Sequence, residues 1–352
     1  MVTRRMFLRA GAAALTLAAL RLPRARAAAL PPADAGGWHL GWLGRTLTTY
    51  VRVYDAPDFG ARQVAWHDFD ELTPLLAETT GPALAGRQNR LWYETPNGYL
   101  HSMDVQPVRY RLNRIVRHFP EQGYLGEITV PYTDAHWYAE KPNYLAYRLY
   151  YGSVMWVQAL AADPNGRPLY RLYDERIGLT YHVPATHVRI INPAEVTPIS
   201  PEVTDKRIVV DLSAQTLTAY ESETVVFATL VSAGRFRSVD NPADDGTVTL
   251  SPEGEFKIIR KKPSRHMGGG YRVGTYELPG VPWVAYFSSG GYAFHGAWWH
   301  NDWGFPHSSG CINMKPEEAL WLYRWTTPVV PYEAEVVDAV GTPVTIVGMA
   351  GW

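Results

Sequence analysis

Cysteine is nearly absent from this 352-residue sequence, which contains one, Cys311. A single thiol excludes an internal disulfide framework and any zinc site built from several cysteines. Lysine is also scarce, with six residues against 27 arginines, a bias that by itself selects no function. The apolar run at residues 10–20 has only 11 residues, whereas a bilayer span needs roughly 18–20.

The formal net charge of −1 conceals an uneven distribution. Residues 1–27 carry six arginines and no acid, which leaves 27 basic against 34 acidic residues, a net charge of −7, in the remainder. A chain of that sign is poorly suited to neutralising phosphates, so we expect no nucleic-acid partner. With 46% hydrophobic and 19% charged residues, the chain can form the cores of two or three domains.

The N-terminus has the order of regions found in export signals. A twin-arginine segment at residues 3–9 precedes the apolar run, and Ala25-Arg26-Ala27 forms an A-x-A cleavage site. We therefore predict a twin-arginine signal peptide at residues 1–27, with no stable membrane span after cleavage. The mature protein is expected in the periplasm, the cell wall or the extracellular space. A retained membrane anchor is the alternative.

Strand and turn patterns divide the rest into three mainly β blocks. Residues 38–110 and 118–192 each contain short strands and a hairpin pattern; that of the first block has an Asn-Gly turn at Asn97-Gly98. A polar, proline-containing stretch at 193–204 is predicted as a linker. In the third block, 205–348, the one plausible helix is Pro316–Trp325.

The densest group of reactive side chains lies between Phe294 and Met314. Cys311 has three histidines nearby in sequence, and an imidazole can accept the thiol proton that a cysteine nucleophile must lose. The preceding Ser308-Ser309-Gly310 is small and flexible, so its backbone N–H groups can face a developing oxyanion. A lone cysteine in an exported chain is a candidate reactive thiol, and a buried inert cysteine is the alternative.

This arrangement resembles the L,D-transpeptidase (YkuD-like) catalytic domain. The similarity rests on His295-Gly296, on residues 308–313, and on three segments earlier in the block: 211–217, 231–234 and 251–256. It covers residues 205–348 and implies a β-sandwich with one or two short helices. The two preceding blocks resemble bacterial SH3-like domains, which are small β-barrels; irregular β structure without a binding role is the alternative.

The resemblance implies a cysteine-dependent acyltransferase. By this resemblance, Cys311 is expected to attack a peptidoglycan stem tetrapeptide, release D-alanine and form a thioester. The acyl group is then expected to pass to an amine of a second stem, giving a 3→3 cross-link. His295 is the implied base, and the backbone of Gly310, Cys311 and Ser309 the implied oxyanion site. Further residues are predicted to bind substrate: Ser308, Asn313, Gly296, Trp299 and His300.

One position departs from the family pattern, because Ser309 stands where the family usually has a histidine. The resemblance implies no cofactor and no metal. The implied partners are donor and acceptor stem peptides and the cell wall.

Alternatives remain open for the protein and for its residues. The same nucleophile serves an L,D-carboxypeptidase, and an inert cell-wall-binding protein is a third possibility. A metal hydrolase would need ligands from His295, His300, Asp302 and His307, which lack the spacing of a helical motif. His300 and His307 are expected on a surface loop; the alternative is that His300 or Asp302 lines the substrate groove.

Two interpretations also remain open for each of two residues and one segment. Asn313 is expected to bind a stem carboxylate or to cap the following helix, and Ser308 to bind substrate or to hydrogen-bond within its turn. Residues 266–271 are expected to form a flap or a plain hairpin loop.

Overall fold

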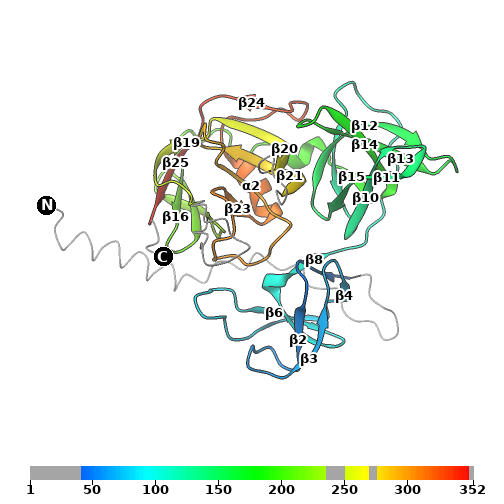
Figure 1. The fold of residues 1–352 in the computed structure, drawn as a ribbon. Coiled ribbons are helices and arrows are strands. Elements are labelled where there is room, and N and C mark those ends of the chain that lie inside the picture. Colours follow the sequence, from blue (N-terminus) through cyan, green and yellow to red (C-terminus); the bar gives the residue numbers. More distant parts are fainter. Residues whose placement is uncertain (1–40, 235–249, 269–275, 349–352) are drawn as a thin grey trace, which may run out of the picture. The chain divides into compact units, whose positions relative to one another are not determined.

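We describe the chain from a computed structural model, which defines residues 41–234, 250–268 and 276–348. Residues 42–352 form one compact unit, and the account below concerns its described residues. Strands dominate it, and α2 (Pro316–Trp325) is the one α-helix in the described residues, so the mainly β prediction is confirmed (Figure 1). In these ranges no helix has the length and apolar character needed to cross a bilayer.

The first module, residues 43–108, contains two antiparallel sheets in the orders β4-β1-β8 and β3-β2-β7-β6-β5. Their elements are β1 (Leu43–Thr46), β2 (Val51–Tyr54), β3 (Gln63–His67), β4 (Leu72–Pro74), β5 (Ala77–Thr80), β6 (Leu91–Thr95), β7 (Gly98–His101), η1 (Ser102–Asp104) and β8 (Val105–Val108). Along β2, buried Val51 and Val53 alternate with exposed Arg52, the pattern of a strand with one face on a core.

The predicted hairpin of this module is present as β6 and β7, but its turn is shifted. Thr95 pairs with Gly98, so Pro96 and Asn97 form the two-residue turn. The predicted Asn97-Gly98 turn was therefore one residue too late. Gly98 has φ +131° and closes the hairpin against the Tyr54 carbonyl, where a side chain has no room.

The second module, residues 124–190, is one seven-stranded antiparallel sheet in the order β11-β10-β14-β13-β12-β9-β15. Its elements are β9 (Tyr124–Ile128), β10 (Tyr132–Tyr138), β11 (Lys141–Tyr150), β12 (Val154–Ala162), β13 (Pro168–Asp174), β14 (Leu179–Pro184), η2 (Ala185–His187) and β15 (Val188–Ile190). Among the described residues, the recorded pairings close neither module into a barrel. The SH3-like barrels therefore stay a prediction.

The third block folds as a β-sandwich, as predicted. Its sheets have the orders β18-β17-β16-β25-β19 and β23-β22-β21-β20-β24, and α2 packs against β21 and β22. The strands are β16 (Lys206–Asp211), β17 (Thr216–Glu221), β18 (Thr224–Leu230), β19 (Gly254–Lys257), β20 (Arg260–Gly268), β21 (Glu277–Tyr286), β22 (Ala293–Gly296), β23 (Ile312–Met314), β24 (Val337–Asp338) and β25 (Pro343–Val347). One core cluster joins both sheets, the helix and Leu125, Val154 and Trp156 of the second module.

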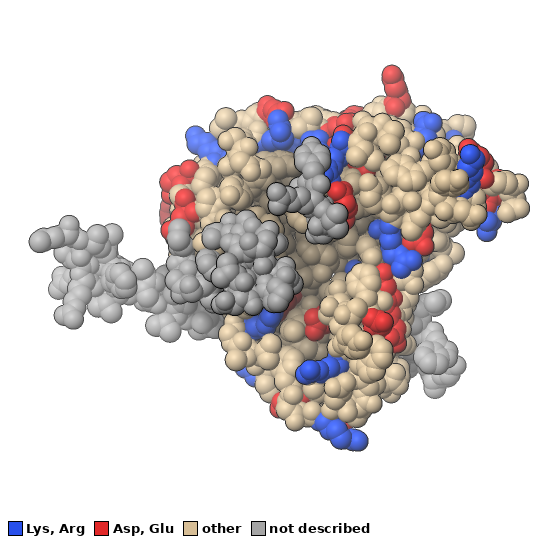
Figure 2. All heavy atoms as spheres, viewed as in Figure 1, with Lys and Arg blue, Asp and Glu red and all other residues tan. Residues whose placement is uncertain are grey.

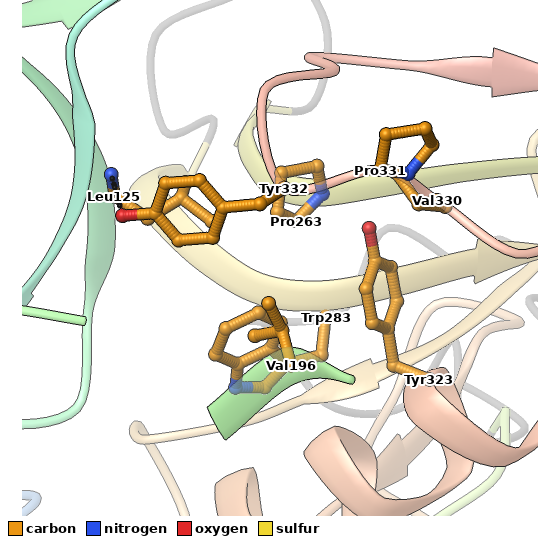
Figure 3. Close-up of a pocket in the computed structure, with 8 residues that line it drawn as sticks. All are labelled: Leu125, Val196, Pro263, Trp283, Tyr323, Val330, Pro331 and Tyr332. Carbon is orange, nitrogen blue, oxygen red and sulfur yellow. Dashed lines mark hydrogen bonds between the residues drawn. The ribbon is translucent and has the colours of Figure 1, made fainter. Parts of the chain in front are cut away.

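The segment predicted as a linker is packed. It contains η3 (Pro193–Val196), and Val196 and Ile199 contact the sandwich core. A shallow crevice beside it is lined by Leu125, Val196, Pro263, Trp283, Tyr323, Val330, Pro331 and Tyr332 (Figure 3). The Tyr332 hydroxyl bridges this boundary by accepting from the Leu125 N–H at 3.1 Å and donating to the Ile191 carbonyl at 2.8 Å. No predicted site residue lines this crevice, which is a seam between the second module and the sandwich.

Candidate active site

Strand pairing brings the predicted nucleophile and base to one face of a sheet. β22 and β23 are parallel, with Phe294 opposite Ile312 and His295 opposite Asn313. Phe294 and Ile312 enter the sandwich core, whereas Cys311 packs in a separate cluster on the other face. Because side chains alternate along a strand, His295 and Asn313 share the face of Cys311. Cys311 is thus a diagonal neighbour of His295.

Trp299 lies beside both groups. Its ring centroid is 5.7 Å from that of His295, and it packs in the same apolar cluster as Cys311. This indole shields one side of the pair from water. Its predicted place at the site is therefore consistent with the geometry, because its ring contacts that of His295.

The His295 ring is fixed in one tautomer by its own chain. It is 2% exposed, and its Nδ1 lies 3.1 Å from the Gly296 carbonyl oxygen. Nδ1 therefore carries the proton and donates it, which leaves the lone pair on Nε2. Burial lowers the pKa of His295 to about 4, against the opposing effect of the Gly296 carbonyl. The ring is neutral at pH 7 and able to accept a proton.

The Cys311 thiol is also neutral at rest. Burial raises its pKa to about 11, although the Ala293 backbone hydrogen bond lowers it in part. The thiol is half-buried and donates weakly to the Gly291 carbonyl at 3.8 Å. The resting pair is thus a neutral thiol and a neutral imidazole rather than a thiolate and an imidazolium.

Ser308 hydrogen-bonds within the turn that presents Cys311. Its Oγ accepts from the Gly310 N–H at 3.0 Å and donates to the Cys311 carbonyl oxygen. The Gly310 N–H is therefore already engaged, which weakens its predicted role at an oxyanion. Gly310 itself has φ +111°, and a Cβ there would lie 2.4 Å from the Tyr292 ring. Ser309, the departure from the family pattern, is exposed.

Two earlier segments of the sandwich hold this turn. Ser251 Oγ donates to the Gly310 carbonyl at 2.8 Å and accepts from the Gly234 N–H at 2.9 Å. Residues 232 and 313 exchange both backbone hydrogen bonds, at 3.0 and 2.9 Å. Sequence reasoning identified segments 231–234 and 251–256 as motifs but missed Ser251 as a residue of the site.

His300 and Asn313 form a buried polar pair on the site face. They are 7% and 1% exposed, and Asn313 Nδ2 donates to His300 Nε2 at 3.0 Å. Burial, followed by the charges of His307 and His295, lowers the pKa of His300 well below its usual range. In the described residues, His300 Nδ1 and Asn313 Oδ1 are buried without hydrogen-bond partners. His300 Nδ1 is a hydrogen-bond donor and Asn313 Oδ1 an acceptor. A bound amide group needs one of each, for its C=O and its N–H.

Two alternative interpretations are thereby corrected. His300 does not lie on a surface loop, because it packs between the Trp303 and His307 rings at 4.6 and 4.7 Å. Asn313 does not cap the helix, since the N-cap of α2 is Lys315.

Gly296, predicted to bind substrate, is required by packing. A Cβ at this position would lie 2.8 Å from the Pro282 ring and 3.0 Å from Pro316 Cα. The predicted flap segment begins within β20, whose Gly268 pairs with Glu277 of β21. Its remaining residues, 269–271, lie outside the described residues. No group of three or more His, Cys, Asp or Glu side chains in the described ranges is placed to hold a metal.

The segment between His295 and Cys311 also contacts both N-terminal modules. Arg45 of the first module donates to the Trp298 carbonyl at 3.2 Å, and Tyr150 of the second stacks on the Trp298 ring at 4.5 Å. Asn301 donates to the Val105 carbonyl at 3.0 Å. These module contacts could not be read from local sequence patterns.

Comparison with known proteins finds one family model that matches the sandwich. Residues 205–346 match the family model for the L,D-transpeptidase catalytic domain, YkuD. No curated protein matches the chain.

Among solved structures, the chain is similar to a mutant L,D-transpeptidase of Enterococcus faecium, with 24% identity, 42% of this chain and 51% of that chain covered, and a TM-score of 0.31. It is also similar to an L,D-transpeptidase from Mycobacterium smegmatis, with 17% identity, coverage of 51% and 90%, and a TM-score of 0.32. The match thus spans about half the length of the E. faecium chain.

Proposed function

We propose that the chain, whose residues 205–346 match the family model for the L,D-transpeptidase catalytic domain, YkuD, is an exported peptidoglycan L,D-transpeptidase. The proposal rests above all on one observation: Cys311 and a neutral, tautomerically fixed His295 share one face of the β22–β23 pair. A thiol beside an unprotonated imidazole is the arrangement that acyl transfer through a thioester requires.

In the first step, Cys311 Sγ attacks the carbonyl carbon of the third stem residue. Because the thiol is neutral at rest, His295 Nε2 takes its proton as the carbon–sulfur bond forms. The backbone N–H of Cys311 is the proposed oxyanion donor, with that of Ser309 beside it. The bond to the terminal D-alanine then breaks, and the imidazolium returns the proton to the leaving amine.

In the second step, a side-chain amine of another stem attacks the thioester carbonyl. His295 accepts a proton from this amine, an amide forms, and the thiol is regenerated. The product is a 3→3 cross-link. Water in place of the amine gives the tripeptide, the product of an L,D-carboxypeptidase, and no cofactor takes part in either case.

We propose that the His300–Asn313 pair binds an amide of the stem peptide. The unpartnered donor at His300 Nδ1 and acceptor at Asn313 Oδ1 support this role, because leaving both unpaired in a buried site costs free energy that a bound amide recovers. Ser308 and Gly296 support the site through the turn and through packing. On the face drawn in Figure 2, basic and acidic side chains of the described residues are interspersed, which suits a peptide partner better than a polyanion.

Export by the twin-arginine route and association with the cell wall remain part of the proposal. They rest on residues 1–27, which lie outside the described residues, and on the resemblance of the sequences of the two N-terminal blocks to bacterial SH3-like domains. An inert cell-wall-binding protein is the competing function.

The intact mass of the purified chain after incubation with a disaccharide-tetrapeptide tests the proposal. We expect an acyl adduct and free D-alanine with the wild type and neither with Cys311→Ala. Dimeric product identifies a transpeptidase, and tripeptide a carboxypeptidase. If the folded, reduced protein gives neither adduct nor D-alanine, the enzymatic proposal is wrong and the wall-binding function is favoured.

A further inference from the structure

A charged contact reaches the candidate site from the first module. Arg87, in the segment between β5 and β6, forms an ion pair with Asp302, and its guanidinium lies over the Phe305 ring at 3.8 Å. The Asp302 side chain is 1% exposed, and the same Oδ2 lies 3.1 Å from His307 Nε2. One buried carboxylate oxygen therefore joins an arginine of the first module to a histidine of the segment that leads to Cys311.

From His307 the connection continues by ring stacking to the substrate pair. The His307 and His300 rings are nearly parallel, at 14°, with centroids 4.7 Å apart. His300 Nε2 accepts from Asn313, and Asn313 lies opposite His295 in the strand register. Four successive contacts thus link Arg87 to the face that carries the nucleophile.

The charges along this connection determine which imidazole carries a proton. Two stacked imidazolium rings repel each other, and the Asp302 carboxylate lies beside His307 rather than His300. Among the described residues, the charged groups near His307 also include Arg87 and Asp104; both Arg87 and His307 lower the pKa of Asp104, against the larger effect of burial. A proton on the stacked pair therefore resides on His307, and His300 stays neutral, with its Nδ1–H available to an acceptor.

We propose that Arg87 is a positioning residue for substrate binding. Together with His307 it fixes the Asp302 carboxylate, and this carboxylate sets the place and the protonation of the His307–His300 stack. The first module therefore completes the substrate subsite of the sandwich. The inference rests on the proposed function in one respect, the assignment of the His300–Asn313 pair as the groups that bind the stem peptide.

Arg87→Gln tests the proposal, with Arg90→Gln as the matched control. Arg90 is exposed, and its Nε donates to the Gly81 carbonyl inside the first module. We expect Arg87→Gln to raise the KM for the tetrapeptide about tenfold, with an unchanged rate of Cys311 alkylation by iodoacetamide. Arg87→Lys keeps the charge over Phe305 and restores part of the affinity, whereas Arg90→Gln changes neither quantity. In a His300→Phe background, Arg87→Gln has no further effect.

A second measurement does not depend on activity. Removing the Arg87 cation takes one positive charge away from Asp302 and His307, so the midpoint of His307 protonation, followed by the NMR signal of its Cε1–H, moves to higher pH. If wild-type protein fails to acylate, the proposed function is wrong, and this titration still tests the connection. An unchanged His307 midpoint in Arg87→Gln overturns the inference. So does an equal rise of KM in Arg90→Gln, or a full effect of Arg87→Gln in the His300→Phe background.

Discussion

Ser251 Oγ donates a hydrogen bond to the Gly310 carbonyl oxygen, 2.8 Å away and 59 residues later in the chain. The same hydroxyl accepts from the Gly234 N–H, so one buried side chain joins three segments of the sandwich. Gly310 directly precedes the candidate nucleophile. Ser251 therefore sets the position of the peptide that presents Cys311, although it makes no recorded contact with the thiol.

Ser251→Ala is expected to reduce both stability and acylation. It leaves a buried carbonyl and a buried N–H unpaired, at a cost of about 3 kcal/mol in the free energy of unfolding, and the acylation rate falls about tenfold as the turn shifts. Urea unfolding and the time course of the acyl adduct measure the two effects. Ser264→Ala is the control, because this buried hydroxyl donates only to the Val154 carbonyl. A Ser251→Ala protein that acylates at the wild-type rate contradicts the prediction.

Gly310→Ala is expected to abolish acylation. The φ of +111° is costly for alanine, and the new Cβ meets the Tyr292 ring at 2.4 Å, which together destabilise the fold by about 3 kcal/mol. Gly166→Ala separates the two causes, since Gly166 has φ +77° with nothing near its Cβ position. This control loses about 1 kcal/mol and keeps full activity. If Gly310→Ala and Gly166→Ala lose the same free energy of unfolding and the same acylation activity, backbone strain alone is responsible.

Local pattern was sufficient to predict the mainly β character of the sandwich and its helix α2. The alternation in β16, the turn before β19 and the proline at the start of α2 each specify a local conformation. The parallel pairing of β22 with β23 is seen only in the folded structure, where it brings His295 close to Cys311. Both residues had been predicted as site residues from the sequence motif.

Long-range contacts were beyond the reach of sequence reasoning. Arg87 and Asp302 are 215 positions apart, and neither residue type nor spacing marks them as partners. The burial of His300 likewise depends on Trp303 and His307 closing over it, so its polar neighbours suggested a surface loop. The turn in the first module was misplaced because Pro96 fits the first central position of a turn as well as Asn97-Gly98 fits a hairpin.

Alkylation of Cys311 is expected to show a protonated thiol at neutral pH. With a pKa raised to about 11, the thiolate fraction and the rate of reaction with iodoacetamide increase about tenfold per pH unit between pH 7 and 9. The rate is followed by intact mass, with Cys311→Ala as the blank. A plateau of the rate below pH 8 would contradict this and would indicate a thiolate–imidazolium pair at rest.

His295 is expected to make the fold less stable in acid. Its pKa is about 4 in the folded chain and near 6.5 when unfolded, so between these values the unfolded chain binds more protons. The neutral His295 ring makes its full contribution to the free energy of unfolding above pH 6.5. This contribution declines as the pH falls toward 4 and is about 2 kcal/mol smaller at pH 5.

Urea unfolding at pH 7 and pH 5 measures this contribution. We expect the loss of stability between the two pH values to be about 2 kcal/mol smaller in His295→Gln than in the wild type. His118→Gln, which replaces an exposed ring, leaves the wild-type difference unchanged. If His295→Gln keeps the full difference, the buried imidazole is not neutral in the folded chain, and the assignment of His295 as a ready proton acceptor is wrong.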